Sequence, residues 1–171
     1  QAVASRVQFR WPSPCATNGV LAAAPVLDLP ARRLWLARSG KQFGSVGESG
    51  FIGNPSLSPD GRRVAVELSD PNRDTAEIWI YDTSSGVGTK FAFSPAHDRN
   101  PIWSPDGTRI VFESDRGAKG AHSDLWIKPL DGGKEEILAG SSDNRHPEDW
   151  SPDGRFLSFG VFAAPDGDLQ L

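Results

Sequence analysis

The sequence predicts an all-β fold built from a repeated unit of four short antiparallel strands, because three markers recur in phase along the chain. The tetrapeptide Ser-Pro-Asp-Gly recurs at intervals of 46 and 47 residues, starting at Ser58, Ser104 and Ser151. A tryptophan recurs at intervals of 44 and 47 residues, at Trp35, Trp79 and Trp126. A polar residue followed by proline recurs just before each tetrapeptide, at Asn54, Asn100 and His146.

The unit that begins at Asn100 shows how each element follows from its residues. Its first strand is a short extended segment over 100–104, where proline is tolerated because the first residue of a strand need not donate to the ladder. Ser-Pro-Asp-Gly then forms a hairpin turn, since proline presets φ and glycine accepts the left-handed conformation. The second strand is predicted over 108–113, which is rich in β-branched and aromatic residues.

The second half of the unit supplies two more strands. After a polar loop, a third strand is expected over 124–128, followed by an Asp-Gly-Gly turn at 131–133 and a fourth strand over 135–138. The preceding unit repeats the pattern, with strands expected over 54–58, 63–68, 77–82 and 89–93.

The two ends of the chain carry weaker copies of the unit. In the first copy we expect a turn at Asn18-Gly19 and strands over 20–24, 34–38 and 43–46. The last copy has two clear strands from His146 onward and stops at 168–171, where a third strand would begin. The expected divisions are a degenerate first unit over 1–50, complete units over 51–97 and 98–144, and a truncated unit over 145–171.

Four strands every 44 to 47 residues is the pattern of β-propeller blades. The chain is predicted to hold about three complete blades and part of a fourth, which makes an incomplete ring. We expect the repeated tryptophans, with Trp103 and Trp150, to be buried between sheets. Because a blade needs neighbours on both sides, we expect a second copy, or more of the native polypeptide, to close the arc.

The hairpin segments resemble the TolB-like β-propeller repeats, in which Asn-Pro-x-Trp-Ser-Pro-Asp-Gly forms the first hairpin. The resemblance is carried by 54–61 and 98–107 and covers about residues 18–160. More narrowly, 38–47 followed by Asn54-Pro55 is similar to the propeller region that follows the kinase domain of acidobacterial-type serine/threonine kinases. The resemblance implies a sensing or binding role and a periplasmic or extracellular location, with the cytoplasm as the alternative.

Composition excludes several classes of function. A net charge of −4 and a pI near 5.3 disfavour nucleic acid as a partner. No apolar run is long enough to span a membrane. A single cysteine, Cys15, excludes an internal disulfide and cysteine-pair zinc sites. Because the chain begins at Gln1 and lacks methionine, we expect a processed chain or part of a longer one.

The candidate ligand-binding residues lie just before the repeated proline, where the first strands of a propeller enter its channel. They are Asn54, Asp98, Arg99, Asn100, Asp143, Arg145 and His146. Arg99 and Arg145 occupy matching positions and are suited to hold a carboxylate or phosphate. The alternative is that each arginine pairs with an acid beside it, such as Asp98 or Asp143. His146 is a weak metal candidate, because a ring of Asn, Asn and His offers few suitable ligands for a transition metal.

No catalytic motif is present. The string nearest to a serine-hydrolase elbow, at 47–51, lacks its last glycine, and no phosphate-binding loop or kinase signature occurs. The repeated aspartates of the tetrapeptide are explained by their place in the hairpin. We therefore expect a non-catalytic module without a cofactor that binds a protein, peptide or small ligand at the channel mouth. The alternatives are part of a propeller enzyme, either a channel-metal lyase or hydrolase or the gating propeller of a serine peptidase, and a purely structural assembly unit.

Overall fold

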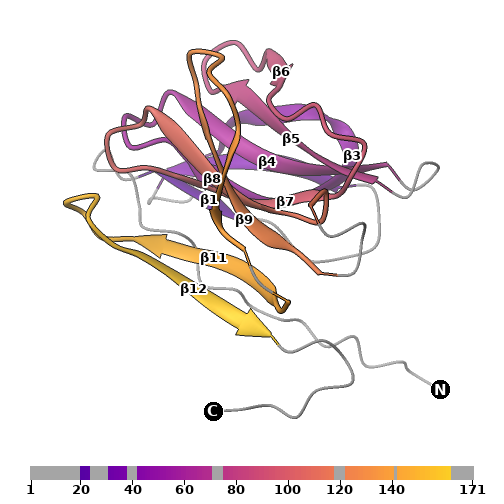
Figure 1. Ribbon diagram of the computed structural model, residues 1–171. Coiled ribbons are helices and arrows are strands. Elements are labelled where there is room, and N and C mark those ends of the chain that lie inside the picture. Colours follow the sequence, from indigo (N-terminus) through magenta and orange to yellow (C-terminus); the bar gives the residue numbers. More distant parts are fainter. Residues whose placement is uncertain are drawn as a thin grey trace, which may run out of the picture.

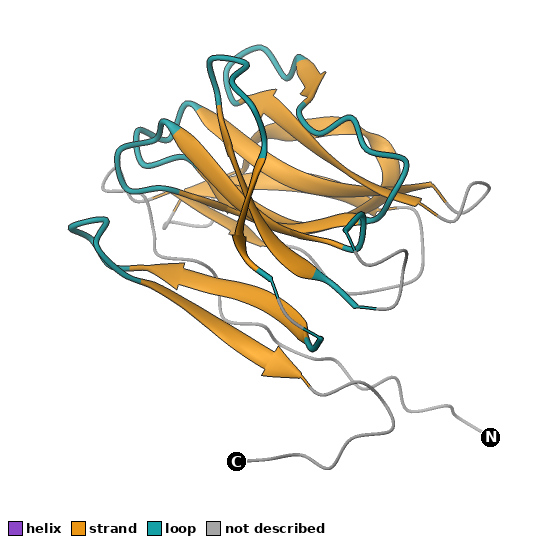
Figure 2. Cartoon of the chain, in the orientation of Figure 1, coloured by secondary structure: helices purple, strands orange, loops and turns teal. Residues whose placement is uncertain are grey.

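A computed structural model describes residues 20–23, 31–37, 42–70, 75–117, 122–140 and 142–162. Within these ranges the chain forms strands and loops and contains no helix, as Figure 2 shows. No helix long and apolar enough to cross a membrane therefore occurs in the described part. Cys15, the expected Asn18-Gly19 turn and the segment 168–171 lie outside the described residues.

The strands form antiparallel sheets in chain order (Figure 1). The bounds are β1 (Val20–Ala23), β2 (Ala31–Ala37), β3 (Gln42–Leu57), β4 (Arg63–Asp70), β5 (Thr75–Asp82), β6 (Gly88–Lys90), β7 (Asp98–Trp103), β8 (Arg109–Ser114), β9 (Asp124–Pro129), β10 (Glu136–Ala139), β11 (Asn144–Trp150) and β12 (Leu157–Phe162). Hydrogen bonds link β1 through β6 in sequence, β7 through β10 in a four-stranded sheet, and β11 with β12. The all-β prediction and the four-stranded antiparallel unit are confirmed.

Strand β3 differs from the expectation of two separate strands. It is a single strand of 16 residues whose first part pairs with β2 and whose second part, from Phe51, pairs with β4. It therefore runs through the expected division at residue 50. The segment contains Gly47, Gly50 and Gly53, and no turn sequence interrupts it. Glycine lets an extended chain bend without ending, so one strand serves two successive sheets.

The three Ser-Pro-Asp-Gly hairpins have the same hydrogen bonds in successive sheets. Each glycine N–H donates to the carbonyl of the serine three residues earlier, over 2.8 Å in all three copies. The serine N–H in turn donates to the carbonyl at the start of the next strand, over 2.8–2.9 Å. The glycines have φ between 68° and 71°, the left-handed region that favours glycine. The predicted equivalence of β3–β4, β7–β8 and β11–β12 is confirmed.

The sheets are held together by an apolar core between them. Strand β7 lies against both β3 and β11, so the first strands of successive sheets are neighbours. Trp103 is 5% exposed in a cluster with Phe91 and Phe112, and its indole N–H donates to the Ser56 carbonyl of the previous sheet over 2.9 Å. The burial predicted for Trp103 is thus confirmed.

The other described tryptophan side chains are only half-buried, contrary to the expectation of burial. The guanidinium carbon of Arg116 lies 4.7 Å from the ring centre of Trp126, so a cation covers one face of the indole. Trp150 lies at the end of β11, and the described part of its sheet has two strands. Trp103, by contrast, packs between the preceding sheet and the other strands of its own four-stranded sheet.

Candidate functional site

The residues before the repeated proline lie at corresponding places of three neighbouring strands. Asn54 is in β3, Asn100 in β7 and His146 in β11. These strands end at the Ser-Pro-Asp-Gly hairpins, so the candidate site lies at the opposite end of the sheets from the hairpins. The topology therefore gathers these polar residues at one end of the first strands, as expected.

The backbone at the two asparagines is strained. Asn54 and Asn100 have φ of 44° and 51°, and both lie at interruptions of the ladder with the following strand. A residue before proline normally adopts an extended conformation, and side chains other than glycine and asparagine avoid positive φ. Strain of this kind persists where the surroundings hold it, and it is concentrated at binding and catalytic sites.

Counting β1–β3 as the first sheet, β3–β6 as the second, β7–β10 as the third and β11–β12 as the fourth, His146 joins the third and fourth sheets through its Nδ1 atom. Nδ1 lies 2.8 Å from Glu113 Oε2 and 3.0 Å from Asn100 Nδ2. A protonated Nδ1 donates to the Glu113 carboxylate, whereas an unprotonated Nδ1 accepts from the Asn100 amide, so one proton selects between the two partners. The Nε2 atom of His146 is buried and has no hydrogen-bond partner in the described ranges. This nitrogen is free to bind a group brought by a ligand.

Asn54 is held within its own sheet. Its Nδ2 donates to Glu67 Oε2 over 2.7 Å. Glu67 and Glu113 were not among the residues singled out from the sequence. A signal was available, because each follows the asparagine of its repeat by 13 residues, which places both across the same hairpin.

The two matching arginines have different surroundings. Arg99 Nη2 lies 2.9 Å from His97 Nδ1, and Arg145 lies with its guanidinium carbon 5.6 Å from the ring centre of Phe159. The Nε of Arg145 is buried and has no hydrogen-bond partner among the described residues. Arg145 and His146, adjacent in β11, thus both present a buried nitrogen that lacks a partner.

Asp98 belongs to a separate charged cluster. It is 1% exposed, and its Oδ1 accepts from Arg116 Nη2 over 2.8 Å, not from Arg99. Arg116 also binds Glu135, which accepts from Lys128 Nζ over 2.9 Å. Burial raises the pKa of Asp98 although Arg116 and Ser114 act against the shift.

Asp143 is the residue before β11 and is half-buried. Of the residues singled out from the sequence, Asn100 and His146 lie together, and Glu113 contacts His146. Asp98 lies apart from them and pairs with Arg116. In the described ranges no group of three or more His, Cys, Asp or Glu side chains is arranged to hold a metal ion.

The repeated hairpin aspartates are occupied within their own turns. In each copy the serine hydroxyl donates to the aspartate two residues later, over 2.5–2.6 Å. These hydroxyl bonds are the main cause that lowers the pKa of Asp60 and of Asp153, and they lower the pKa of Asp106 to about 2. Their carboxylates stabilise the turns, which accounts for their repetition without a catalytic role.

Neighbouring first strands, repeated hairpins and antiparallel sheets of four strands together define a segment of a β-propeller. Residues 36–165 match the TolB beta propeller domain family. The chain belongs to this family.

Two known proteins illustrate what the chain resembles. It is 34% identical over 110 residues to the uncharacterized peptidase YuxL of Bacillus subtilis (strain 168), a match that covers 62% of this chain and 16% of YuxL. It is 33% identical over 97 residues to the Tol-Pal system protein TolB of Anaeromyxobacter dehalogenans (strain 2CP-C), covering 54% of this chain and 20% of TolB. The chain thus spans about a fifth or less of the length of these relatives.

Among solved structures, TolB from Acinetobacter baumannii superimposes with a TM-score of 0.75 at 20% identity, covering 97% of this chain and 40% of that protein. At this identity the likeness concerns the fold.

Proposed function

We propose that the chain is a non-catalytic binding module whose ligand docks at the start of its first strands, around Arg145 and His146. The observation that supports this is the pair of buried nitrogens, Arg145 Nε and His146 Nε2, that lack a partner in the described part of the chain. A buried polar group without a partner costs about 1–3 kcal/mol, and a ligand that supplies the complementary group, an acceptor for Arg145 Nε and a donor or acceptor for His146 Nε2 according to its tautomer, removes that cost. The strained backbone at Asn54 and Asn100 supports the same location.

The ligand class we favour is a protein or peptide. Its carboxylates and carbonyl groups are the acceptors that Arg145 lacks, and the rings of Phe159 and Phe162 lie beside Arg145 and His146. Resemblance to a Tol-Pal system protein supports a protein partner, and with it a sensing role and a periplasmic or extracellular location. A cytoplasmic location is the alternative.

The test starts from peptides selected from a random displayed library on the immobilised chain. The selected peptides are then titrated by calorimetry into the wild type, into the Arg145→Ala/His146→Ala variant and into Arg109→Gln. Arg109 is exposed at the hairpin end and serves as the matched control. We expect the double variant to bind about tenfold more weakly and the control to bind like the wild type. Equal binding by all three proteins, with unchanged circular dichroism, would place the ligand elsewhere.

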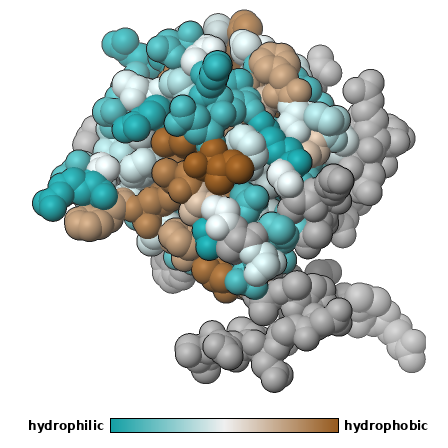
Figure 3. Space-filling view, viewed as in Figure 1, coloured by the Kyte–Doolittle hydropathy of each residue, from teal (hydrophilic) through white to brown (hydrophobic). Residues whose placement is uncertain are grey.

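Self-association is a further part of the proposal. The β11–β12 sheet and the segment before β12 expose large apolar side chains, namely Phe156 (64%), Phe159 (39%), Val161 (53%) and Phe162 (53%). Figure 3 shows apolar surface gathered toward this side of the molecule. We propose that a second copy covers this face and extends the ring. Light scattering should then give a dimer or larger species that Val161→Asp dissociates, and a stable monomer at micromolar concentration would contradict self-association.

The second candidate function is part of a propeller enzyme. The similarity to YuxL favours the gating propeller of a serine peptidase, which requires a Gly-x-Ser-x-Gly domain in the same polypeptide. The channel-metal alternative predicts that zinc or manganese binds the chain and that His146→Ala abolishes this binding. Absence of metal binding in a calorimetric titration would remove that alternative.

A further inference from the structure

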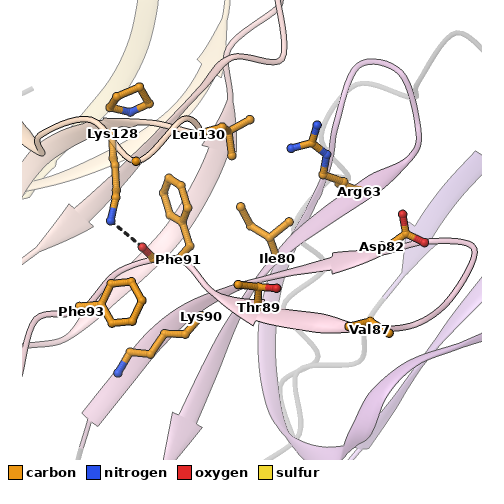
Figure 4. Close-up of a pocket in the computed structure, with 12 residues that line it drawn as sticks. Arg63, Ile80, Asp82, Val87, Thr89, Lys90, Phe91, Phe93, Lys128 and Leu130 are labelled. Carbon is orange, nitrogen blue, oxygen red and sulfur yellow. Dashed lines mark hydrogen bonds between the residues drawn. The ribbon is translucent and has the colours of Figure 1, made fainter.

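A groove lies between the second and third sheets, at the hairpin end of the strands and away from Arg145 and His146 (Figure 4). Its volume is about 500 Å³. It is formed by the start of β4, the end of β5, the strand β6 with the segment that follows it, and the end of β9 with its turn. The groove therefore spans a junction between two repeats.

The floor of the groove is apolar and one wall is an exposed aromatic ring. Ile80 and Leu130 pack against the core cluster that contains Phe91. Phe93, two residues farther along, is 72% exposed, and Val87 is 66% exposed. Exposed apolar side chains beside a core-backed hollow are typical of a binding surface.

Cations surround this apolar surface. The Nζ of Lys90 lies 5.7 Å from the ring centre of Phe93, and the Nζ of Lys128 lies 5.3 Å from the same centre. Both ammonium groups have carboxylate partners outside the groove, Glu77 and Glu135 respectively. These ion pairs fix the two lysines in the wall of the groove, and the two carboxylates largely compensate the lysine charges.

Arg63 is a cation of the groove that forms no ion pair among the described residues, although the charge of Asp60 in the same hairpin acts on it. Within the described part of the chain no carboxylate lies within ion-pair distance of its guanidinium, whose nearest aromatic contact is Trp103, 6.0 Å from ring centre to carbon. Figure 4 shows the Arg63 side chain reaching toward the groove, and Asp82, its register partner on the neighbouring strand β5, lies on the same side. Asp82 Oδ1 already accepts hydrogen bonds from Ser84 and Ser85. An acidic group in the groove would thus meet a guanidinium that forms no ion pair within the described ranges.

One residue in the wall of this groove, Lys90, is not a general property of the repeat, whereas Arg63 has a counterpart in Arg109. In the second sheet Lys90 is the register partner of Trp79, whereas in the third sheet the partner of the equivalent Trp126 is Ile137. A feature that one repeat has and the next lacks is not required by the fold. This difference points to a role in recognition.

We propose that the groove binds a peptide segment that presents a carboxylate beside an apolar side chain. The carboxylate pairs with Arg63, whose planar guanidinium can bind both oxygens. The apolar side chain packs on Phe93 and Val87 above the floor of the groove. The positive charge of Arg63 next to the exposed Phe93 and Val87 is complementary to a carboxylate next to an apolar side chain, so an acidic peptide segment is the occupant that fits.

The test uses two defined probes, acetyl-Leu-Glu-Leu-amide and acetyl-Leu-Gln-Leu-amide, titrated into the isotope-labelled full chain and followed by amide chemical shifts. We expect saturable shifts at Val87, Phe93 and Leu130 that are stronger for the glutamate peptide. Arg63→Gln should weaken the glutamate peptide about three- to tenfold, to the level of the glutamine peptide. Phe93→Ala should weaken both peptides, and because Phe93 is an exposed side chain its removal leaves the core in place.

Arg109→Gln is the matched control, because Arg109 follows the hairpin of the next sheet as Arg63 follows its own. It should leave both affinities unchanged, as should Arg145→Ala/His146→Ala, which separates this groove from the site proposed above. Equal binding of the two peptides, or an equal loss in Arg109→Gln, would overturn the proposal. Chemical-shift changes confined to β11 would also overturn it. So would a glutamate peptide whose binding Phe93→Ala leaves unchanged and that inorganic phosphate displaces completely.

Discussion

Trp103 connects two sheets, and its removal gives the most direct test of how the repeats are held together. An aromatic side chain of this kind buries about 150–250 Å². At about 25 cal/mol per Å², its burial contributes roughly 4–6 kcal/mol. The ring is 5% exposed among Phe91, Ile110 and Phe112, which leave little room to collapse into its place. We therefore expect Trp103→Ala to lower the free energy of unfolding by about 3–5 kcal/mol.

A second substitution separates the hydrogen bond from the cavity. Trp103→Phe keeps an aromatic ring but leaves the buried Ser56 carbonyl without its donor, which should cost about 1–3 kcal/mol. Trp150→Phe is the matched control, because the indole N–H of Trp150 has no partner in the described ranges, so its loss should be nearly neutral. Urea unfolding followed by circular dichroism measures all three. A loss under about 1 kcal/mol for Trp103→Ala, or equal losses for the two phenylalanine variants, would refute this account of the junction.

Two further predictions concern charged groups. The pKa of Asp106 is lowered to about 2 in the folded chain, against about 3.9 in an unfolded chain. The ionised carboxylate therefore stabilises the fold fully above about pH 4, and this stabilisation is lost as the pH falls toward 2. The stability difference between the wild type and Asp106→Asn should therefore be present at pH 7 and absent near pH 2 in urea titrations, and a difference that persists in acid would contradict the hairpin role. Arg116→Ala removes the partner of the buried Asp98 carboxylate and should lower the free energy of unfolding by about 3 kcal/mol or more. The double variant Arg116→Ala/Asp98→Asn should recover part of this loss. A double variant no more stable than Arg116→Ala would show that the charge pair is unimportant.

The elements with strong local signals could be predicted from the sequence. The Ser-Pro-Asp-Gly turn carries its own conformational preferences, so all three hairpins occur where expected. The third strand of the third sheet was expected over 124–128 and is observed as Asp124–Pro129. Strand β3 was not foreseen as one element, because glycines at 47, 50 and 53 look like breaks locally while pairing on both sides keeps the chain extended.

The candidate site was predictable in position but not in contacts. The repeat shows that Asn100 and His146 occupy equivalent places, yet it does not show how far one sheet is rotated against the next. That rotation brings the histidine of the following sheet within hydrogen-bond distance of Glu113, a contact that the asparagine–glutamate pair of Asn54 and Glu67 alone would not have predicted. The same limit applies to Asp98, which contacts Arg116 beyond the end of β8 and not the arginine beside it in the sequence.

Differences between repeats separate recognition from folding in this chain. The hairpin positions are alike in all three copies because each serine, aspartate and glycine completes bonds within its own turn. Two other positions differ between repeats. His146 stands where the other repeats have asparagine, and Ile137 stands where the preceding repeat has Lys90. Both fall at junctions between sheets, where a substitution alters the surface without breaking a turn, and binding specificity is therefore expected at the junctions.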